Sequence, residues 1–321
     1  TATTYTYGAL EVDGADTLNM TKSVKGSAES KFLSLLNNGT INIKAHGNDN
    51  AQSTGLSFCE EVVNNGMINL NGSSARNRTT AKLNFESNFV NKGKIAIVQI
   101  AGDRNNVNFN IKGGVKGENN GEIVVSLEGT RSDGSNYARM LIDIPVVKVA
   151  YYTLGGNGVI ELLENDRSNN LSGMPVLSGS SAQMIVTNGI NHTIMGSGNV
   201  DKFSLVNEGL VVATGDNLRL SVQHTYRDAN GQTMINTVNG RMVAVGAAGL
   251  YLGASTDKNS QFFNYGLLEA RHGSFIEFRK GVTESNSKSK ISTSVAAKWG
   301  GRWAGSGEFR MFRPLALTQE S

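Results

Sequence analysis

The chain has 321 residues, of which 39% are apolar and 18% charged, and its formal net charge is +3. Glycine occurs 38 times and asparagine 36 times, but proline only three times, which favours many tight turns between fully hydrogen-bonded strands over a disordered chain. A single cysteine, Cys59, excludes an intramolecular disulfide, and no apolar run reaches the ~18 residues of a membrane-spanning helix.

The first 30 residues predict the start of a stack of strands. Tyr5-Thr6-Tyr7 and Leu10-Glu11-Val12 alternate apolar and polar residues, as strands do. The first residues, Thr1 to Tyr5, resemble a processed N-terminus, so we expect that a targeting segment was removed. The only helix that the sequence suggests is a short one near residues 28–36.

An internal repeat follows. Leu36-Asn37-Asn38-Gly39-Thr40-Ile41-Asn42-Ile43 recurs at residues 63–70, 90–97 and 118–125, with its glycines at 39, 66, 93 and 121, at intervals of 27, 27 and 28. Less regular copies begin near residues 156, 206 and 263, and residues 188–190 and 230–235 are candidates for missing copies. The expected corner residues are Asn37, Gly39, Asn64, Gly66, Asn91, Gly93, Asn119, Gly121, Asn157, Gly158, Asn207, Gly209, Asn264 and Gly266.

Each copy has a physical interpretation. Asn tolerates a turn conformation, Gly is expected to supply a positive φ, and the following Ile-x-Ile places two apolar side chains on one face of a strand. About 27 residues accommodate three strands and three corners. We therefore predict an all-β, right-handed parallel β-helix, a three-sided solenoid, over residues 1–280. The missing leucine spacing argues against leucine-rich repeats, and the period argues against propeller blades.

The basic charge lies at the C-terminal end. Residues 267–321 contain nine Lys or Arg and five Glu, a net charge of +4, whereas the rest of the chain has −1. Both tryptophans lie here among arginines, so residues 281–321 are predicted to cap the last coil or to form a basic and aromatic binding or subunit-contact surface. The candidate ligand-binding residues are Arg271, Arg279, Lys280, Lys298, Trp299, Arg302, Trp303, Arg310 and Arg313.

Between the repeats, polar segments of variable length predict protruding loops. They lie at residues 101–110, 129–138, 165–173 and 225–230. Insertions of this kind often build the binding face of a repeat protein.

Motifs for catalysis are weak. A glycosidase needs two carboxylates at a fixed separation, and the candidates are Asp103, Asp133, Asp143, Asp166, Asp201, Asp216 and Asp228. A solvated position in a loop is favoured for each of them. No Gly-x-Ser-x-Gly motif is present, the four histidines lack the spacing of metal ligands, and Cys59 is expected to be a core residue. We predict no catalytic residues, no cofactor and no metal, and leave enzyme activity open as the less favoured alternative.

The repeat, with residues 192–200 and 205–209, resembles the passenger domains of bacterial autotransporter adhesins and filamentous-haemagglutinin-type proteins over roughly residues 30–270. The resemblance implies a protein that is secreted or at the bacterial cell surface, with a role in adhesion and virulence. It also implies an outer-membrane translocator barrel, which this chain lacks.

Three functional hypotheses follow. The leading one is an adhesin that binds an extracellular glycan, a host matrix protein or itself, and not nucleic acid. The second is a polysaccharide-active enzyme or phage tailspike, which requires acids within ~10 Å of each other on adjacent coils. The third is a self-assembling filament subunit.

Overall fold

The structure is a computed structural model. It describes residues 6–21, 27–44, 52–72, 79–100, 106–128, 137–146, 149–164, 174–181, 183–224, 232–254, 261–280, 296–298, 302–311 and 316–318. All regular elements in these ranges are strands. None of the described residues forms a helix with the length and apolarity of a membrane span.

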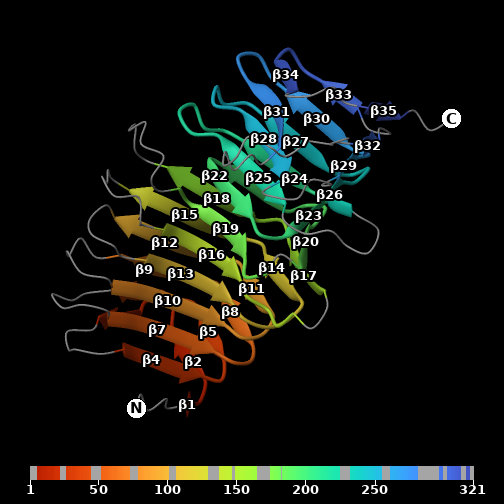
Figure 1. Ribbon diagram of the computed structural model, residues 1–321. Coiled ribbons are helices and arrows are strands. Elements are labelled where there is room, and N and C mark those ends of the chain that lie inside the picture. Colours follow the sequence, from red (N-terminus) through yellow and green to blue (C-terminus); the bar gives the residue numbers. More distant parts are fainter. Residues whose placement is uncertain are drawn as a thin grey trace. The chain divides into compact units, whose positions relative to one another are not determined.

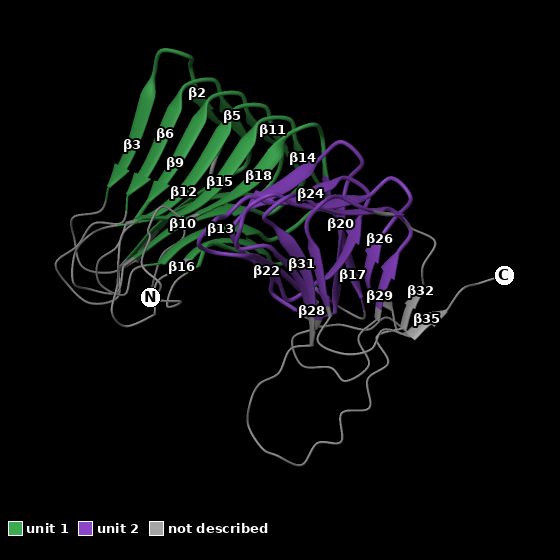
Figure 2. Cartoon of the chain, turned by 90° about the horizontal axis from the view of Figure 1, so that it is seen from above, with its two compact units in different colours: residues 1–145, 155–178 green, residues 146–154, 179–321 purple. Residues whose placement is uncertain are grey.

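The chain divides into two compact units, which Figure 2 shows in different colours. The first contains residues 1–145 and 155–178, and the second residues 146–154 and 179–321. In both units all strands but two belong to three parallel sheets, here called A, B and C, and each strand pairs with the strand three places further along the chain. The prediction of an all-β, three-sided parallel β-helix is confirmed.

In the first unit the sheets share one order of strands (Figure 1). Sheet A contains β1 (Thr6–Tyr7), β4 (Ser27–Phe32), β7 (Gln52–Phe58), β10 (Thr79–Phe85), β13 (Asn106–Ile111), β16 (Tyr137–Ile142) and β19 (Val176–Gly179). Sheet B contains β2 (Leu10–Val12), β5 (Leu35–Asn37), β8 (Val62–Asn64), β11 (Phe89–Asn91) and β14 (Lys116–Asn119). Sheet C contains β3 (Thr17–Thr21), β6 (Thr40–Lys44), β9 (Met67–Asn71), β12 (Lys94–Ile100), β15 (Glu122–Glu128) and β18 (Val159–Glu164).

The second unit repeats this pattern. Sheet A contains β22 (Gly198–Asp201), β25 (Leu220–His224), β28 (Leu250–Ala254), β31 (Phe275–Lys280) and β34 (Glu308–Met311). Sheet B contains β17 (Ala150–Gly155), β20 (Met184–Asn188), β23 (Ser204–Asn207), β26 (Gln232–Asn236) and β29 (Gln261–Asn264). Sheet C contains β21 (Thr193–Gly196), β24 (Leu210–Ala213), β27 (Arg241–Ala244), β30 (Leu267–Ala270) and β33 (Arg302–Ala304). A separate pair joins β32 (Ala296–Lys298) and β35 (Ala316–Thr318).

The predicted short helix near residues 28–36 is wrong, because those residues belong to β4 and β5. Pairing of β4 with β7 in register, Phe32 opposite Phe58, fixes an extended backbone there. Tertiary pairing thus overrides the local helix propensity of Ala28 to Lys31.

The core of the first unit consists of stacked rows of like side chains. On sheet C, the first isoleucine of each repeat lies opposite the next, and the whole row is fully buried: Ile41, Ile68, Ile95, Ile123 and Ile160. On sheet A, the rings of Phe32, Phe58, Phe85 and Phe109 follow one another at centroid distances of 5.8, 6.1 and 4.9 Å. Each buried side chain of this size contributes roughly 1.5–3 kcal/mol to stability.

Buried asparagines form a ladder at the end of sheet B. In the first unit, the Nδ2 atoms of Asn37, Asn64 and Asn91 each donate to Oδ1 of the next asparagine in the row at 2.7 Å, and the row ends at Asn119. The other N–H of Asn64 donates to the carbonyl oxygen of Lys94 at 3.3 Å. Both N–H groups of the Asn64 side chain therefore donate a hydrogen bond, as a fully buried polar side chain requires.

The corner glycines of the first unit have a different role from the one expected. The φ angles of Gly66 and Gly93 lie outside the left-handed region, so the expectation of positive φ is wrong for these corners. A Cβ on Gly93 would instead overlap the carbonyl oxygen of Gly66 and lie 2.8 Å from the carbonyl carbon of Asn65. The coils stack so closely at this corner that no side chain fits.

The second unit contains its own ladder, with less regular spacing. Asn188, Asn207, Asn236 and Asn264 are linked in turn by Nδ2-to-Oδ1 hydrogen bonds across 19, 29 and 28 residues. Leu154 lies opposite Asn188 on β17, whereas the predicted corner residue Asn157 is exposed. The suggested copy at residues 188–190 thus belongs to the ladder. Asn230 lies outside the described residues, and Asn236 was missed.

The last strands continue the sheets of the second unit: β33 pairs with β30, and β34 with β31. Most of residues 281–321 lie outside the described residues. The boundary at residue 280 and the capping role of this segment therefore remain predictions.

Candidate functional site

Five arginines of the second unit lie on sheet C, on sheet A or at the corner between them; Arg241 and Arg302 are the first residues of their sheet C strands. The five are Arg219, Arg241, Arg271, Arg302 and Arg310, and we call this set the arginine corner. Each turn of the chain passes this corner once, at residues 214–219, 245–249, 271–274 and 305–307. Every one of these four successive coils contributes at least one arginine.

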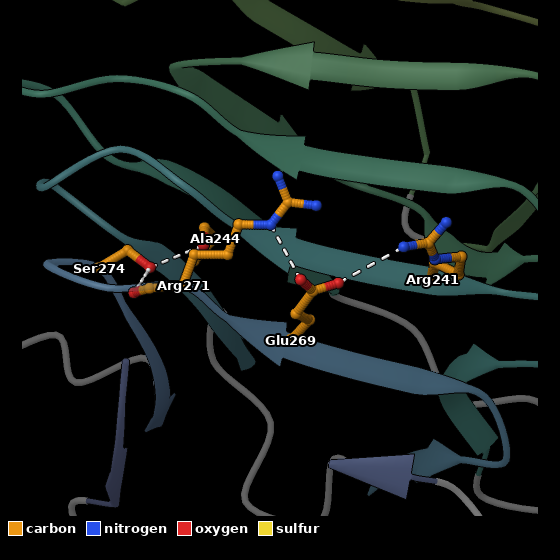
Figure 3. A network of polar contacts seen from close by, with 5 residues as sticks. All are labelled: Arg241, Ala244, Glu269, Arg271 and Ser274. Atoms are coloured by element: carbon orange, nitrogen blue, oxygen red, sulfur yellow. Dashed lines mark hydrogen bonds and ion pairs between the residues drawn. The ribbon is translucent and has the colours of Figure 1, made fainter. Parts of the chain in front are cut away.

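On the sheet C side, two arginines bind one carboxylate, and a third lies on the next strand. Arg241 on β27 and Arg302 on β33 both pair with Leu267 on β30, which lies between these two strands. Glu269 accepts a hydrogen bond from Nε of Arg271 at 2.9 Å and from Nη2 of Arg241 at 3.4 Å. Figure 3 shows the two guanidinium groups on opposite sides of this carboxylate. The hydrogen bond from Arg271 is the largest cause that lowers the pKa of Glu269, which therefore stays ionised.

The turn that carries Arg271 is fixed by Ser274. The Ser274 hydroxyl lies 2.7 Å from the carbonyl oxygens of both Ala244 and Arg271, and thus ties the turn to the preceding coil (Figure 3). Gly273, at φ 78°, provides the left-handed residue of the turn. The side chains of Arg271 and Arg241 remain half-exposed, at 56% and 50%. Both can reach a ligand from a rigid backbone.

On the sheet A side, two aromatic rings lie between two arginines. The Arg219 guanidinium carbon lies 4.8 Å from the centroid of the Tyr251 ring, and that of Arg310 lies 3.7 Å from the Phe275 ring. The two rings meet edge to face at 5.5 Å. Nε of Arg310 also donates to Glu308 at 2.8 Å. Cation–π contacts of this type hold the planar arginine groups in place.

Three of the nine predicted binding residues belong to the arginine corner, and the structure describes their side chains: Arg271, Arg302 and Arg310. For Arg279, Lys280, Lys298 and Trp303 only the backbone is described, and Trp299 and Arg313 lie outside the described residues. The prediction missed Arg219 and Arg241, and the aromatic residues Tyr251 and Phe275. One signal could have found Arg241, because it follows a glycine, Gly240, just as Arg302 follows Gly301.

A second polar cluster lies on the outer face of sheet A in the first unit. Glu29 accepts hydrogen bonds from the Ser57 hydroxyl and, at 2.7 Å, from Nδ2 of Asn84. Lys31, two residues further along β4, forms an ion pair with Glu86 at 2.8 Å. The side chains of Glu29 and Lys31 thus extend across β7 to residues at the end of β10. The hydrogen bond with Glu86 raises the pKa of Lys31.

Two carboxylates lie on neighbouring strands of sheet C in the same unit. Val124 pairs with Glu161, so Glu122 and Glu161 are diagonal neighbours on the outward face. Burial, followed by the charge of Glu122, raises the pKa of Glu161. Nζ of Lys94 lies 2.9 Å from the Glu122 carboxylate. None of the predicted aspartates belongs to this pair.

The residues considered as catalytic candidates have other positions. Oδ1 of Asp216 accepts a hydrogen bond from the backbone N–H of Ala247 at 3.1 Å. Asp103, Asp133, Asp166 and Asp228 lie outside the described residues. Cys59 is half-buried at a corner, so its expected place in the core is wrong. Within the described ranges, no three His, Cys, Asp or Glu side chains gather as a metal site would require.

No known family model, curated protein or solved structure matches this chain.

Proposed function

We propose that this chain is an adhesin-type protein, secreted or at the bacterial cell surface, which binds an extended extracellular polymer, foremost a glycan, on the outer faces of its sheets. The observation that carries the proposal is a row of outward-facing amides on sheet C of the first unit, of which Asn19 is exposed and Asn42 and Asn69 are half-buried. Nδ2 of Asn42 donates to Oδ1 of Asn19, and Nδ2 of Asn69 to Oδ1 of Asn42, both at 2.8 Å.

The row repeats one amide on three successive coils, about 4.8 Å apart, and ends where Ala96 follows Asn69. A polysaccharide repeats its hydroxyl groups along its length, and can therefore meet several coils with the same contact. Each contact is weak, but contacts in series strengthen one another because later ones form within one complex. The resemblance of the repeat to adhesin passenger domains supports the same proposal.

The test is an array of glycans and matrix proteins probed with the labelled chain. We expect binding to a set of related glycans, and a loss of about 10-fold in the variant Asn42→Ala/Asn69→Ala, which shortens the row. The matched control is Asn38→Ala/Asn65→Ala, since these two exposed amides also share a 2.8 Å hydrogen bond but lie at the corner. Binding to no array member would contradict the proposal.

A specific observation supports a second candidate, a polysaccharide-cleaving enzyme. Glu161, whose pKa is raised, lies diagonally from Glu122 on the adjacent strand. A protonated Glu161 could donate its proton to the leaving glycosidic oxygen, while Glu122, which is paired with Lys94, acts as nucleophile or activates water. Glycans incubated with the protein would then gain reducing ends, and Glu161→Gln would abolish this gain. Glu118→Gln, at an exposed carboxylate, is the control.

A further inference from the structure

We infer that the arginine corner of the second unit binds an acidic polysaccharide, one that carries sulfate or carboxylate groups at regular intervals. The inference rests on the proposed function and names the ligand class for a different face of the protein. It is carried by the recurrence of arginine in four successive coils and by the way neighbouring side chains hold these arginines.

The spacing suits a glycan chain laid along the stack of coils. Arg241 and Arg302 lie on strands two steps apart, with Leu267 between them, so their Cα atoms are separated by about 10 Å. This is close to the length of two linked sugar rings, so a charged group on every second sugar would meet both arginines. Arg271, in the turn after the intervening strand, shares the Glu269 carboxylate with Arg241, so the two guanidinium groups lie near each other.

The chemistry of the site favours paired oxygens. All five basic residues are arginines, and the guanidinium fork binds carboxylate and sulfate groups with two parallel hydrogen bonds. Arg219 stacks on Tyr251 and has no carboxylate partner among the described residues. Its N–H donors are held in place by the ring and remain available to a ligand. The half-exposed Tyr251 ring also offers an apolar surface to the C–H face of a sugar.

The charge balance favours a glycan over a nucleic acid. Carboxylates are interleaved with the arginines, namely Asp216, Glu269 and Glu308 on the surface and the buried Glu277. The net charge of the corner is therefore small. Duplex DNA carries one negative charge per about 1.7 Å of its axis, and would meet these acids as well as the arginines. A polymer with widely spaced charges can contact the arginines and avoid the acids.

The experiment measures binding of dextran sulfate, polygalacturonate and neutral dextran of matched length to the whole chain by titration calorimetry. We expect both acidic polymers to bind, and neutral dextran not to bind. The variant Arg241→Gln/Arg302→Gln should weaken binding at least about 10-fold, because two charge-assisted contacts are lost. The matched control Lys44→Gln/Lys112→Gln removes two exposed charges from the first unit and should change binding by less than about 2-fold.

A third variant separates charge from folding. Glu269→Gln removes the carboxylate that competes with a ligand for Arg241 and Arg271, so we expect binding to tighten about 2- to 3-fold. A loss of folding would weaken binding in every variant. Unchanged binding in Arg241→Gln/Arg302→Gln, or equally tight binding of single-stranded DNA, would overturn the inference. If only neutral glycans of the array bind, this inference fails while the proposed function stands.

Discussion

Nδ1 of His192 lies 2.7 Å from Oδ1 of Asn188, at the start of the asparagine ladder in the second unit. Elsewhere in the ladder, that oxygen accepts from the asparagine of the preceding coil. Leu154 holds this position one coil before Asn188 and cannot donate, so the imidazole N–H takes its place. The histidine is fully buried, and it completes the hydrogen bonding of the ladder with an aromatic donor.

The first prediction is a loss of stability in acid that depends on His192. Burial lowers the pKa of His192 from its usual value of 6.5 to about 4. Between these two pH values the unfolded chain binds a proton that the folded chain does not. The stabilising contribution is therefore complete above about pH 6.5 and is lost as the pH falls toward 4, by about 3 kcal/mol in total.

Urea unfolding midpoints measured from about pH 7.5 to pH 4 check this prediction. His192→Gln keeps an N–H donor for Asn188 but does not titrate, so its midpoint should fall less steeply over this range. Parallel pH profiles for the two proteins would show that His192 does not control the acid sensitivity.

The second prediction concerns the interior of the buried ladder. Asn64→Ala removes the acceptor of Asn37 and the donor to Asn91, and leaves both amides without these partners in the core. We expect a loss of roughly 2–4 kcal/mol in the free energy of unfolding, measured by urea denaturation. Asn42→Ala, in the outward-facing amide row, is the control and should cost less than about 1 kcal/mol, because water can reach its partners. Equal losses would mean that burial of the ladder is unimportant.

The third prediction tests the close stacking of the corners. Gly93→Ala forces a methyl group against the backbone of Gly66 and Asn65, which no rotation of a side chain can relieve. The cost should be at least about 3 kcal/mol, as for severe overpacking. Gly8→Ala, where nothing lies within 4 Å of the added Cβ, should leave the thermal midpoint nearly unchanged. A tolerated Gly93→Ala would mean that the coils can separate at this corner.

The repeat made the fold predictable, because identical corners must stack and their residues recur in the sequence at the coil length. Asn64 and Gly66 recur as Asn91 and Gly93 for this reason. The pattern is weaker in the second unit, where the corners vary in length. Three residues separate Asn236 from Gly240, but only one separates Asn64 from Gly66. The Asn-x-Gly pattern therefore does not identify Asn236. The sequence also does not distinguish why the corner residue is glycine, because a close approach of two backbones and a positive φ both favour glycine.

The arginine corner was only partly predictable. The dense positive charge near the C-terminal end of the sequence predicts Arg271, Arg302 and Arg310, which lie within one short segment. Arg219 and Arg241 belong to earlier coils, and only the stacking of the coils brings them beside the others. The contacts of Arg219 with Tyr251 and of Arg310 with Phe275 depend on the side-chain positions, which the sequence pattern does not specify.

The last prediction concerns the start of the ladder in the first unit, where no histidine substitutes for the missing donor. Val12 pairs with Asn37, and Oδ1 of Asn37 is buried with no hydrogen-bond partner in the described part of the chain. In Val12→Asn, the new amide N–H would donate to this oxygen and extend the ladder by one step. The hydrogen bond should offset much of the lost valine burial, so we expect a change of less than about 1 kcal/mol.

Val12→Asp provides an isosteric comparison. The ionised carboxylate only accepts hydrogen bonds, so it would face the unpaired Oδ1 of Asn37 without a proton between them. We expect this variant to be less stable than Val12→Asn by at least about 2 kcal/mol near neutral pH, and the difference to shrink as the carboxyl is protonated in acid. Urea midpoints of the two variants at about pH 7 and pH 4 measure this difference. If the variants unfold at the same midpoint at both pH values, the side chain at residue 12 does not reach the ladder.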